Sequence, residues 1–422
     1  MRGPIAVHRR PLAGLGWTLF AALAAFASIA GGACALDSEG LLANSGSVPG
    51  SSSGAGGAGG AGGGGGAGGS AGGEASTSSS GGGGGAGGEG GGGPVSPYLY
   101  RQPITITTGS AAVPADYSIA VQIDHAALVA NTKSLKNGSD VRIYRTNGSS
   151  FEELHRVLDP TSAWNTATTT LWFRLKSDIP ASTTDSSYYL FYGDPDAPSP
   201  PSDGSQVYLV WDDFTDPSLS PAWKFEPIGN AKGTVMVTSG VAAITASTGD
   251  IWAKQDSFVF LHRPVTGDFV ADSLVTSIGG KSDIWGKLGG VMIRESNLAS
   301  SRNRLMSPVY LAAGRTNSYR LKDGNDTTED TSGNSRSLPE LDRVTRLGDK
   351  SSASFSSDLK AFQKLGNEIT FMTPLSPTIL VGIPVCNINA GDVVVSVDWF
   401  RVRRLVIPAP EASLHPEEPG EF

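Results

Sequence analysis

Short apolar runs with a period of two residues recur through most of this chain and constrain its fold more strongly than any other feature. Successive side chains of a β-strand point to opposite faces, so an alternating run of about four to eight residues predicts a strand with one buried face. These runs end at Gly, Pro, Asn, Asp or Ser, which favour turns. The pattern predicts an all-β fold, with strands at Ile104/Ile106, Ile119/Val121/Ile123, Val141/Ile143, Leu171/Phe173/Leu175, Val235/Val237, Val241/Ala243, Phe269/Ala271 and Val393/Val395/Val397/Trp399.

Helical periodicity is nearly absent, with one exception. Asp124 is placed to cap a helix that begins at His125, because its carboxylate can accept backbone N–H groups of the first turn. We therefore expect one short helix at residues 125–130, ahead of the turn at Asn137-Gly138.

A proline-rich stretch divides the β-rich part of the chain. Residues 194–204 hold four prolines, and proline cannot donate the backbone hydrogen bond that a central strand needs. The stretch 96–407 holds about 310 residues, which is enough for two domains of ordinary size. We expect two β-sandwiches, at residues 96–204 and 205–407, and a disordered tail at residues 408–422.

The N-terminal residues 1–33 read as the signal peptide of a bacterial lipoprotein. Three arginines precede the apolar run Leu15–Ala30, and small residues lead directly into Cys34. We expect lipid on Cys34 and a place in the cell envelope, at the outer membrane or the cell surface. Gly31 stands where such signals usually carry leucine, so cleavage without lipid stays an alternative. An uncleaved membrane anchor is another, although the run is shorter than the ~20 residues that cross a bilayer.

Residues 34–95 are expected to form a disordered tether. Of the 56 glycines in the chain, 25 lie between Gly54 and Gly93, where the only charges are Glu74 and Glu89. Such a segment has no apolar surface to offset the conformational entropy of folding. As a flexible coil it would span roughly 40 to 45 Å. A glycine-rich filament or a phase-separating segment is the competing interpretation.

Charge and cysteine content argue against nucleic-acid binding and against a catalytic cysteine. The formal net charge is −8, and removing the three arginines of the signal leaves 29 basic against 40 acidic residues, or about −11. This balance disfavours nucleic acid as a partner. If Cys34 takes lipid, Cys386 has no disulfide partner in the chain. It ends the apolar run Ile379–Cys386, which predicts a buried side chain rather than a nucleophile.

The first β-rich region resembles an uncharacterised module of bacterial surface proteins. Members of that family have no assigned activity, often precede concanavalin A-like or laminin G-like domains, and are in some proteins fused to proton-channel subunits of the TolQ and ExbB type. The resemblance implies a fold but no chemistry. It rests on Tyr100-Arg-Gln-Pro-Ile-Thr-Ile, Val113-Pro-Ala-Asp-Tyr, Val121-Gln-Ile-Asp-His, Asp140-Val-Arg-Ile, Leu171-Trp-Phe-Arg-Leu and Tyr188-Tyr-Leu-Phe-Tyr-Gly-Asp-Pro.

The second β-rich region resembles concanavalin A-like glucanase and lectin domains of the regulation-of-enolase type. This implies a jelly-roll sandwich that binds or cleaves glycans. Related domains carry an aromatic-rich strand before a Ser-Ser-Asp turn and a Trp after it, whereas this chain has Ser351–Phe355 and Leu359–Phe362 there. The resemblance rests on Trp211-Asp-Asp-Phe, Gly267-Asp-Phe-Val, Gly289-Gly-Val-Met-Ile-Arg-Glu-Ser, Thr345-Arg-Leu-Gly-Asp, Ser356-Ser-Asp and Val397-Asp-Trp-Phe-Arg-Val.

A sugar site needs a flat apolar ring to stack on the pyranose and polar groups to hold its hydroxyls. In Met292-Ile-Arg-Glu the strand period opposes Arg294 to Glu295, and in Val397-Asp-Trp-Phe it opposes Asp398 to Trp399. One face of each strand is therefore mixed. The competing interpretation is that the arginine or the glutamate pairs with a neighbouring strand and the tryptophans fill the sandwich. The candidate ligand-binding residues are Trp252, Trp285, Arg294, Glu295, Asp398 and Trp399.

Catalysis has little support in the sequence. A retaining glycosidase needs two carboxylates about 5.5 Å apart, which acids two apart on one strand face supply. Glu340 and Asp342 have that spacing but follow Pro339 in a loop-like stretch. No Gly-x-Ser-x-Gly elbow occurs in the two β-rich regions, and the five histidines form no cluster suited to zinc. We expect no catalytic residues and no cofactor.

Calcium is the one ion that the sequence leaves open. The loop Asp323–Asp330 is rich in oxygen ligands but lacks EF-hand spacing, which favours a solvated polar loop.

These observations favour a lipid-anchored, non-catalytic surface protein that binds a glycan or polysaccharide. One alternative is a polysaccharide hydrolase or lyase in the second sandwich. Another is an envelope scaffold linked to a TolQ/ExbB-like complex.

Overall fold

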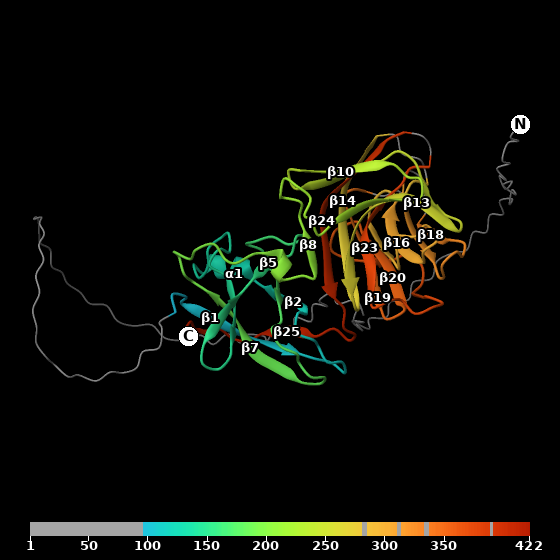
Figure 1. Cartoon of the computed structure of the whole chain (residues 1–422). Helices are drawn as coiled ribbons and strands as arrows, with labels where there is room; N and C mark the ends of the chain where they lie inside the picture. Colours follow the sequence, from blue (N-terminus) through green and yellow to red (C-terminus); the bar gives the residue numbers. More distant parts are fainter. Residues whose placement is uncertain (1–95, 281–284, 310–313, 333–336, 389–390) are drawn as a thin grey trace, which may run out of the picture. The chain divides into compact units, whose positions relative to one another are not determined.

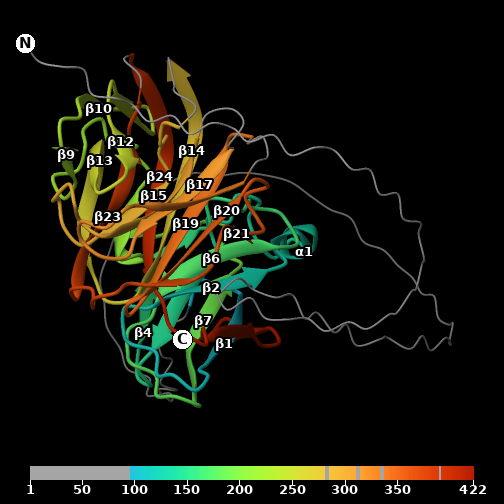
Figure 2. The same ribbon diagram turned by 90° about the vertical axis from the view of Figure 1, so that its right-hand side faces the viewer.

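The computed structural model describes residues 96–280, 285–309, 314–332, 337–388 and 391–422, and they form two antiparallel β-sandwiches (Figures 1 and 2). The all-β expectation is confirmed. The signal peptide, Cys34 and the glycine-rich tether lie outside these residues. Within the described ranges, no helix is both long and apolar enough to cross a membrane.

The first sandwich packs a six-stranded sheet against a three-stranded one. Along the larger sheet the order is β25-β1-β7-β3-β4, with β26 also on β1, and the smaller sheet has the order β2-β6-β5. The strands are β1 (Tyr100–Thr107), β2 (Ser118–Ile123), β3 (Arg142–Thr146), β4 (Phe151–Leu154), β5 (Arg156–Leu158), β6 (Thr169–Arg174), β7 (Thr184–Tyr192), β25 (Glu411–Leu414) and β26 (Glu418–Pro419).

The predicted helix is confirmed. Helix α1 spans His125–Ala130, and the Asp124 carboxylate accepts the backbone N–H of Ala127 at 2.9 Å. The capping residue thus fixes the start of the helix, as its side-chain chemistry requires.

The second sandwich packs a nine-stranded sheet against an eight-stranded one. The larger sheet holds β8 (Val210–Asp212), β10 (Gly233–Thr238), β11 (Val241–Ala246), β14 (Phe269–Gly280), β19 (Glu340–Leu347), β20 (Lys350–Ser356), β21 (Gln363–Lys364), β22 (Ile369–Thr370) and β24 (Val393–Arg404). The smaller holds β9 (Lys224–Ile228), β12 (Asp250–Trp252), β13 (Gln255–Thr266), β15 (Val291–Arg294), β16 (Asn303–Pro308), β17 (Arg315–Arg320), β18 (Thr328–Ser332) and β23 (Thr378–Val385). A short 3₁₀ helix, η1 (Gly204–Gln206), precedes β8.

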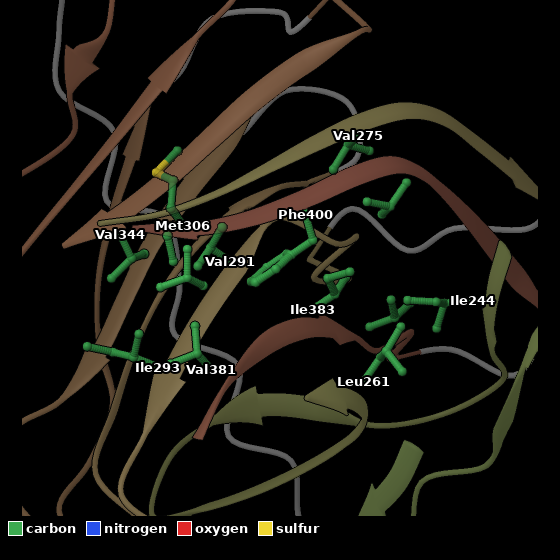
Figure 3. Close-up of a cluster of buried hydrophobic side chains, with 14 of the residues drawn as sticks. Ile244, Leu261, Val275, Val291, Ile293, Met306, Val344, Val381, Ile383 and Phe400 are labelled. Atoms are coloured by element: carbon green, nitrogen blue, oxygen red, sulfur yellow. The ribbon is translucent and has the colours of Figure 1, made fainter. Parts of the chain in front are cut away.

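Alternate side chains of both sheets meet in the core of the second sandwich (Figure 3). Val275 and Val344 come from the nine-stranded sheet, and Ile293, Val381 and Ile383 come from the eight-stranded sheet. All five are almost completely buried. The period of two that predicted the strands therefore also gives the core.

Two strands depart from the predicted phase. In β11 the buried residues are Ala242, Ile244 and Ala246, so Val241 and Ala243 face away from the core. In β24 the pairing with β14 slips at Asp398, because Leu274 pairs with Trp399 while Val275 pairs with Val397. A β-bulge of one extra residue reverses the faces beyond it.

The residues expected to form a disordered tail are ordered instead. Strand β25 pairs with β1 from Ile104↔Leu414 to Thr107↔Glu411, and β26 pairs with its other end. Ala412 and Leu414 also pack against the core of the first sandwich. Two alternating apolar residues are too short a run to recognise in the sequence, which explains the wrong prediction.

Candidate functional site

The structure does not bring the six predicted ligand-binding residues together. Asp398 and Trp399 lie on β24 of the nine-stranded sheet, whereas Arg294 ends β15 of the eight-stranded sheet and Glu295 follows it. Trp252 ends β12, and Trp285 lies ahead of β15.

Arg294 takes part in a buried ion network. Its Nη1 lies 2.9 Å from Oδ2 of Asp256, and the other carboxylate oxygen lies 2.7 Å from Nη2 of Arg320. Asn303 donates to the same carboxylate at 3.0 Å. All of these side chains are buried, so the network supports the fold and offers no group to a ligand.

Glu295 is also engaged within the protein. Its carboxylate lies 3.2 Å from Nη2 of Arg302, and it accepts the backbone N–H of Ser376 at 3.1 Å. The predicted alternative of an ion pair thus describes both Arg294 and Glu295.

Trp399 points away from the inter-sheet core because of the bulge at Asp398, and a second layer of side chains covers it. Only 3% of Trp399 is exposed, and its ring stacks on Trp211 at 6.1 Å between centroids. Asp398 stays half-buried, where burial, and secondarily the charge of Asp213, raise its pKa.

Trp252 and Trp285 remain open to solvent, at 46% and 44% exposure. Large aromatic side chains are usually more buried than this. The backbone N–H of Cys386 donates to the oxygen of Lys287, and Leu288 pairs with Val385, so the segment that carries Trp285 runs beside the end of β23.

Strand β12 is held in place by the buried side chain of Ile251 and by a backbone hydrogen bond at the turn that follows it. Ile251 is completely buried in a small apolar cluster with Phe258, Phe260, Met292, Leu305 and Cys386. Beyond it, the backbone oxygen of Ala253 accepts the N–H of Thr327 at 2.9 Å. Because neighbouring side chains alternate, Asp250 and Trp252 share the face opposite Ile251.

Cys386 joins this hairpin to the segment that carries Trp285. Its buried thiol accepts the N–H of Lys287 at 3.4 Å and also bonds the N–H of Ile251. Burial raises the pKa of the thiol to about 12, so the sulfur stays protonated and unreactive at neutral pH. The predicted role of Cys386 as a buried apolar residue agrees with this environment.

A buried ion pair joins the segment that carries Trp285 to strand β18. Nζ of Lys287 lies 2.7 Å from Oε1 of Glu329 on β18. The hydroxyls of Thr316 and Ser318 donate to the same carboxylate oxygen. The positive charge of Lys287 is thereby balanced by the carboxylate of Glu329, and its side chain is held in a fixed orientation.

Asp250 is the third charged member of this group. Burial raises its pKa to about 6, Lys287 opposes that shift, and the charge of Glu329 adds to it. A carboxyl group with this pKa exchanges its proton near neutral pH. We call Trp252, Trp285, Asp250, Lys287 and Glu329 the tryptophan site. It combines exposed indole rings with carboxylates that can accept sugar hydroxyls.

Sequence reasoning found the two tryptophans but missed the three charged residues. Asp250 precedes Trp252 by two positions, and Lys287 follows Trp285 by two. The strand period could have grouped Asp250 with Trp252, which share β12. Glu329 falls in the stretch Asp323–Asp330, which was expected to be a polar loop, but it lies on strand β18. Its contact with Lys287 across 42 positions has no local signal in the sequence.

The other acidic candidates are used inside the protein. Glu340 and Asp342 lie on strand β19 and not in a loop, and both are completely buried. Glu340 pairs with Arg315 at 2.6 Å. Asp323 pairs with Arg302 at 3.4 Å. Among the described residues, no group of three or more His, Cys, Asp or Glu side chains is arranged to hold a metal ion.

A small recess lies elsewhere, at one end of the nine-stranded sheet. Its exposed Lys350–Glu368 pair is separated by 3.0 Å. No aromatic side chain lines it, so it lacks a surface on which a sugar ring could stack. Its lining residues are Thr345, Leu347, Lys350, Ser351, Ser352, Lys364, Glu368, Leu405 and Ile407.

Comparison with known families identifies one domain. Residues 137–226 match a family described as a domain of unknown function, DUF2341. This confirms the expected domain without assigned activity, and the match continues past the predicted boundary at residue 204 into β9. A comparison with curated proteins finds no match.

Several solved structures show a distant likeness. A functionally unknown protein from Saccharomyces cerevisiae is 18% identical over 44% of this chain and 97% of its own, with a TM-score of 0.36. A laminarinase from Flavobacterium sp. UMI-01 is 12% identical over 47% and 100%, with a TM-score of 0.33. A legume lectin-like domain from Entamoeba histolytica is 14% identical over 46% and 96%, with a TM-score of 0.34. These TM-scores lie below 0.5, and the fold assignment rests on the sheet topology instead.

Proposed function

We propose that the protein binds a glycan without cleaving it and that the tryptophan site is where it does so. The observation that carries this proposal is that two exposed indoles belong to the two segments that carry a structured charged group. Trp252 lies two residues from Asp250, and Trp285 lies two residues from Lys287, whose pair with Glu329 is fixed by two hydroxyl donors.

Each part of the site suits one part of a sugar. The C–H face of a pyranose ring stacks on an indole, and such aromatic contacts contribute about 0.5 to 1.5 kcal/mol each. The hydroxyls need acceptors, which Asp250 supplies at the half-buried rim of the site. The Arg294–Asp256–Arg320 network includes Asp256, which pairs with Ile251 in the β12–β13 hairpin, and so keeps this platform rigid.

We also propose that the sandwiches are displayed on the bacterial envelope by lipid on Cys34 and the glycine-rich tether. The support is the signal-like N-terminus and the composition of residues 34–95. Labelling of cells with a fatty-acid probe should mark the wild-type chain and leave a Cys34→Ser variant unmarked. A labelled variant would contradict this part of the proposal.

A broad glycan array probed with the full chain, with and without calcium, tests the binding function. We expect specific retention that Trp252→Ala and Trp285→Ala each weaken about three- to tenfold, consistent with the loss of one stacking contact. Met236→Ala is the matched control, because Met236 is even more exposed, at 65%, but lies on edge strand β10. Absence of glycan binding by the folded chain would overturn the proposal and favour the envelope-scaffold alternative.

A polysaccharide hydrolase or lyase is the second candidate. The raised pKa of Asp250, about 6, is the property that a general acid requires. Incubation of the chain with polysaccharides that it retains would separate the two functions. If the chain releases sugars and Asp250→Asn abolishes this release, the protein is a hydrolase or lyase and the binding proposal is wrong. Retention of the polysaccharide without release of sugars would support binding.

A further inference from the structure

One edge of β1 in the first sandwich pairs with residues 411–422, which lie beside it in Figure 1. Strand β1 pairs with β7 on its other side, so without this segment it would be an edge strand. An unpaired edge is a template for another strand. The segment follows the second sandwich in the chain, after β24 ends at Arg404.

The segment contacts this edge in the manner of a bound peptide. Four consecutive residue pairs form the β25 ladder, and every second side chain, Ala412 and Leu414, packs inward against the core. Ser413 lies opposite Thr105 and stays exposed. Peptides that add a strand to a sheet edge bind in this way, with main-chain hydrogen bonds for affinity and alternate side chains for specificity.

Charge complementarity fixes the register. Glu417 lies 2.5 Å from Nζ of Lys133 and accepts the hydroxyl of Tyr192 at 2.7 Å. Glu418 lies 3.1 Å from Nε of Arg101. The segment is thus acidic, and the surface that receives it supplies a lysine and an arginine.

An aromatic residue anchors the last part of the segment. The ring of Phe422 lies 5.1 Å from that of Phe191 and 5.2 Å from those of Tyr144 and Phe151. These rings belong to β7, β3 and β4, on the outer face of the sheet. Aromatic side chains of this kind dominate binding energy at protein interfaces.

We propose that the β1 edge and this aromatic patch form a peptide-receptor surface, and that residues 411–422 from a second copy of the chain can replace the resident segment. The contacts would be identical in both cases, which makes exchange between copies a route to association at little energetic cost. The stretch 405–410 that leads to the segment contains two prolines and forms no strand.

A cleavable full-length chain tests the receptor surface. A specific protease sequence is inserted between Ile407 and Pro408, and the cut protein is separated from the released segment. A fluorescent peptide of residues 409–422 should then bind in a saturable manner, and at least tenfold more tightly than it binds the uncut chain. Peptides with Phe422→Ala or Glu417→Gln should bind at least fivefold more weakly. Unfolding of the cut protein, or a peptide that fails to bind, would overturn the proposal.

The exchange between copies needs its own measurement. Cut protein that has lost its segment is mixed with intact, tagged chain, and the mass of the complex is measured by sedimentation. A one-to-one complex of cut and intact chain that dissociates when free peptide is added supports the second copy as partner. If the peptide binds but intact chains form no complex, the second copy is ruled out. Glu411→Ala, at an exposed position of β25 without a side-chain contact among the bonds described, serves as the matched control peptide.

Discussion

The outer face of the nine-stranded sheet and the outer face of the eight-stranded sheet each carry a buried aspartate that joins two arginines. On the first face Asp272 lies between Arg343 and Arg401, at 2.6 and 2.9 Å. On the second face Asp256 lies between Arg294 and Arg320, at 2.9 and 2.7 Å. The difference is what lies above these networks.

Above Asp272, other side chains form a complete cover. Trp399 packs with Leu274 and Leu341 beneath Trp211, and the ring of Phe362 lies 3.5 Å from the guanidinium of Arg343. Arg401 also reaches Asp159, which follows β5 of the first sandwich, at 3.0 Å. Around Asp256 the arginines also donate to backbone oxygens, Arg294 to that of Leu298 and Arg320 to those of Ala253 and Ser301. Trp252 and Trp285, elsewhere on the second sandwich, face solvent. Tryptophans therefore serve packing at one place in this domain and are available for recognition at another.

The largest effect should come from Asp272→Ala, because it leaves two arginines buried without their shared carboxylate. Breaking a buried ion pair in this way costs about 3 to 5 kcal/mol. We expect the free energy of unfolding in urea to fall by that amount. Asp216→Ala, at an exposed position, is the control and should change stability little. A loss below about 1 kcal/mol for Asp272→Ala would show that this face is not sealed from water.

Trp399→Ala should be nearly as harmful, because it removes a buried ring from the covered face. Truncation of buried aromatic side chains costs about 3 to 5 kcal/mol, and the position beside the half-buried Trp211 places Trp399 at the lower end. The same urea titration measures it. Under conditions in which the Trp399→Ala variant is folded, its glycan retention should equal that of the wild type. Selective loss of retention would move the recognition site to this face.

Asp250→Asn should change how stability depends on pH. Burial raises the pKa of Asp250 to about 6, above the ~3.9 of an unfolded chain, so the folded protein binds an extra proton between about pH 4 and pH 6. Stability attributable to this group therefore falls as pH rises through that window, by about 1 kcal/mol after allowance for solvent screening. Thermal unfolding across that range should show a smaller decrease in the variant. An unchanged slope would contradict the assignment.

Trp252→Ala should have the smallest effect on stability, within about 0.5 kcal/mol, because exposed substitutions remove few contacts. Urea unfolding of this variant beside Trp399→Ala gives the direct contrast between an exposed and a buried tryptophan. If Trp252→Ala costs as much as Trp399→Ala, the exposed ring is part of the packing and the tryptophan site loses its basis.

The period of two in the sequence was sufficient for most strands and for helix α1, because each depends on local alternation or on one capping side chain. It failed at Trp399, where one extra residue at Asp398 reverses the faces of β24. The candidate site was predicted only in part. Trp252 and Trp285 are visible in the sequence, but the Lys287–Glu329 contact depends on how distant strands pack.

Pairing between β1 and β25 also determines the order in which the molecule can be completed during synthesis. The hydroxyl of Thr105 contacts the ring of His415 at 2.7 Å, and these residues are 310 positions apart. Domains usually fold in the order in which they leave the ribosome. Here the second sandwich, up to Arg404 of β24, is translated before β25, the strand that completes the sheet beside β1. The sandwich that is made first is the one that is closed last.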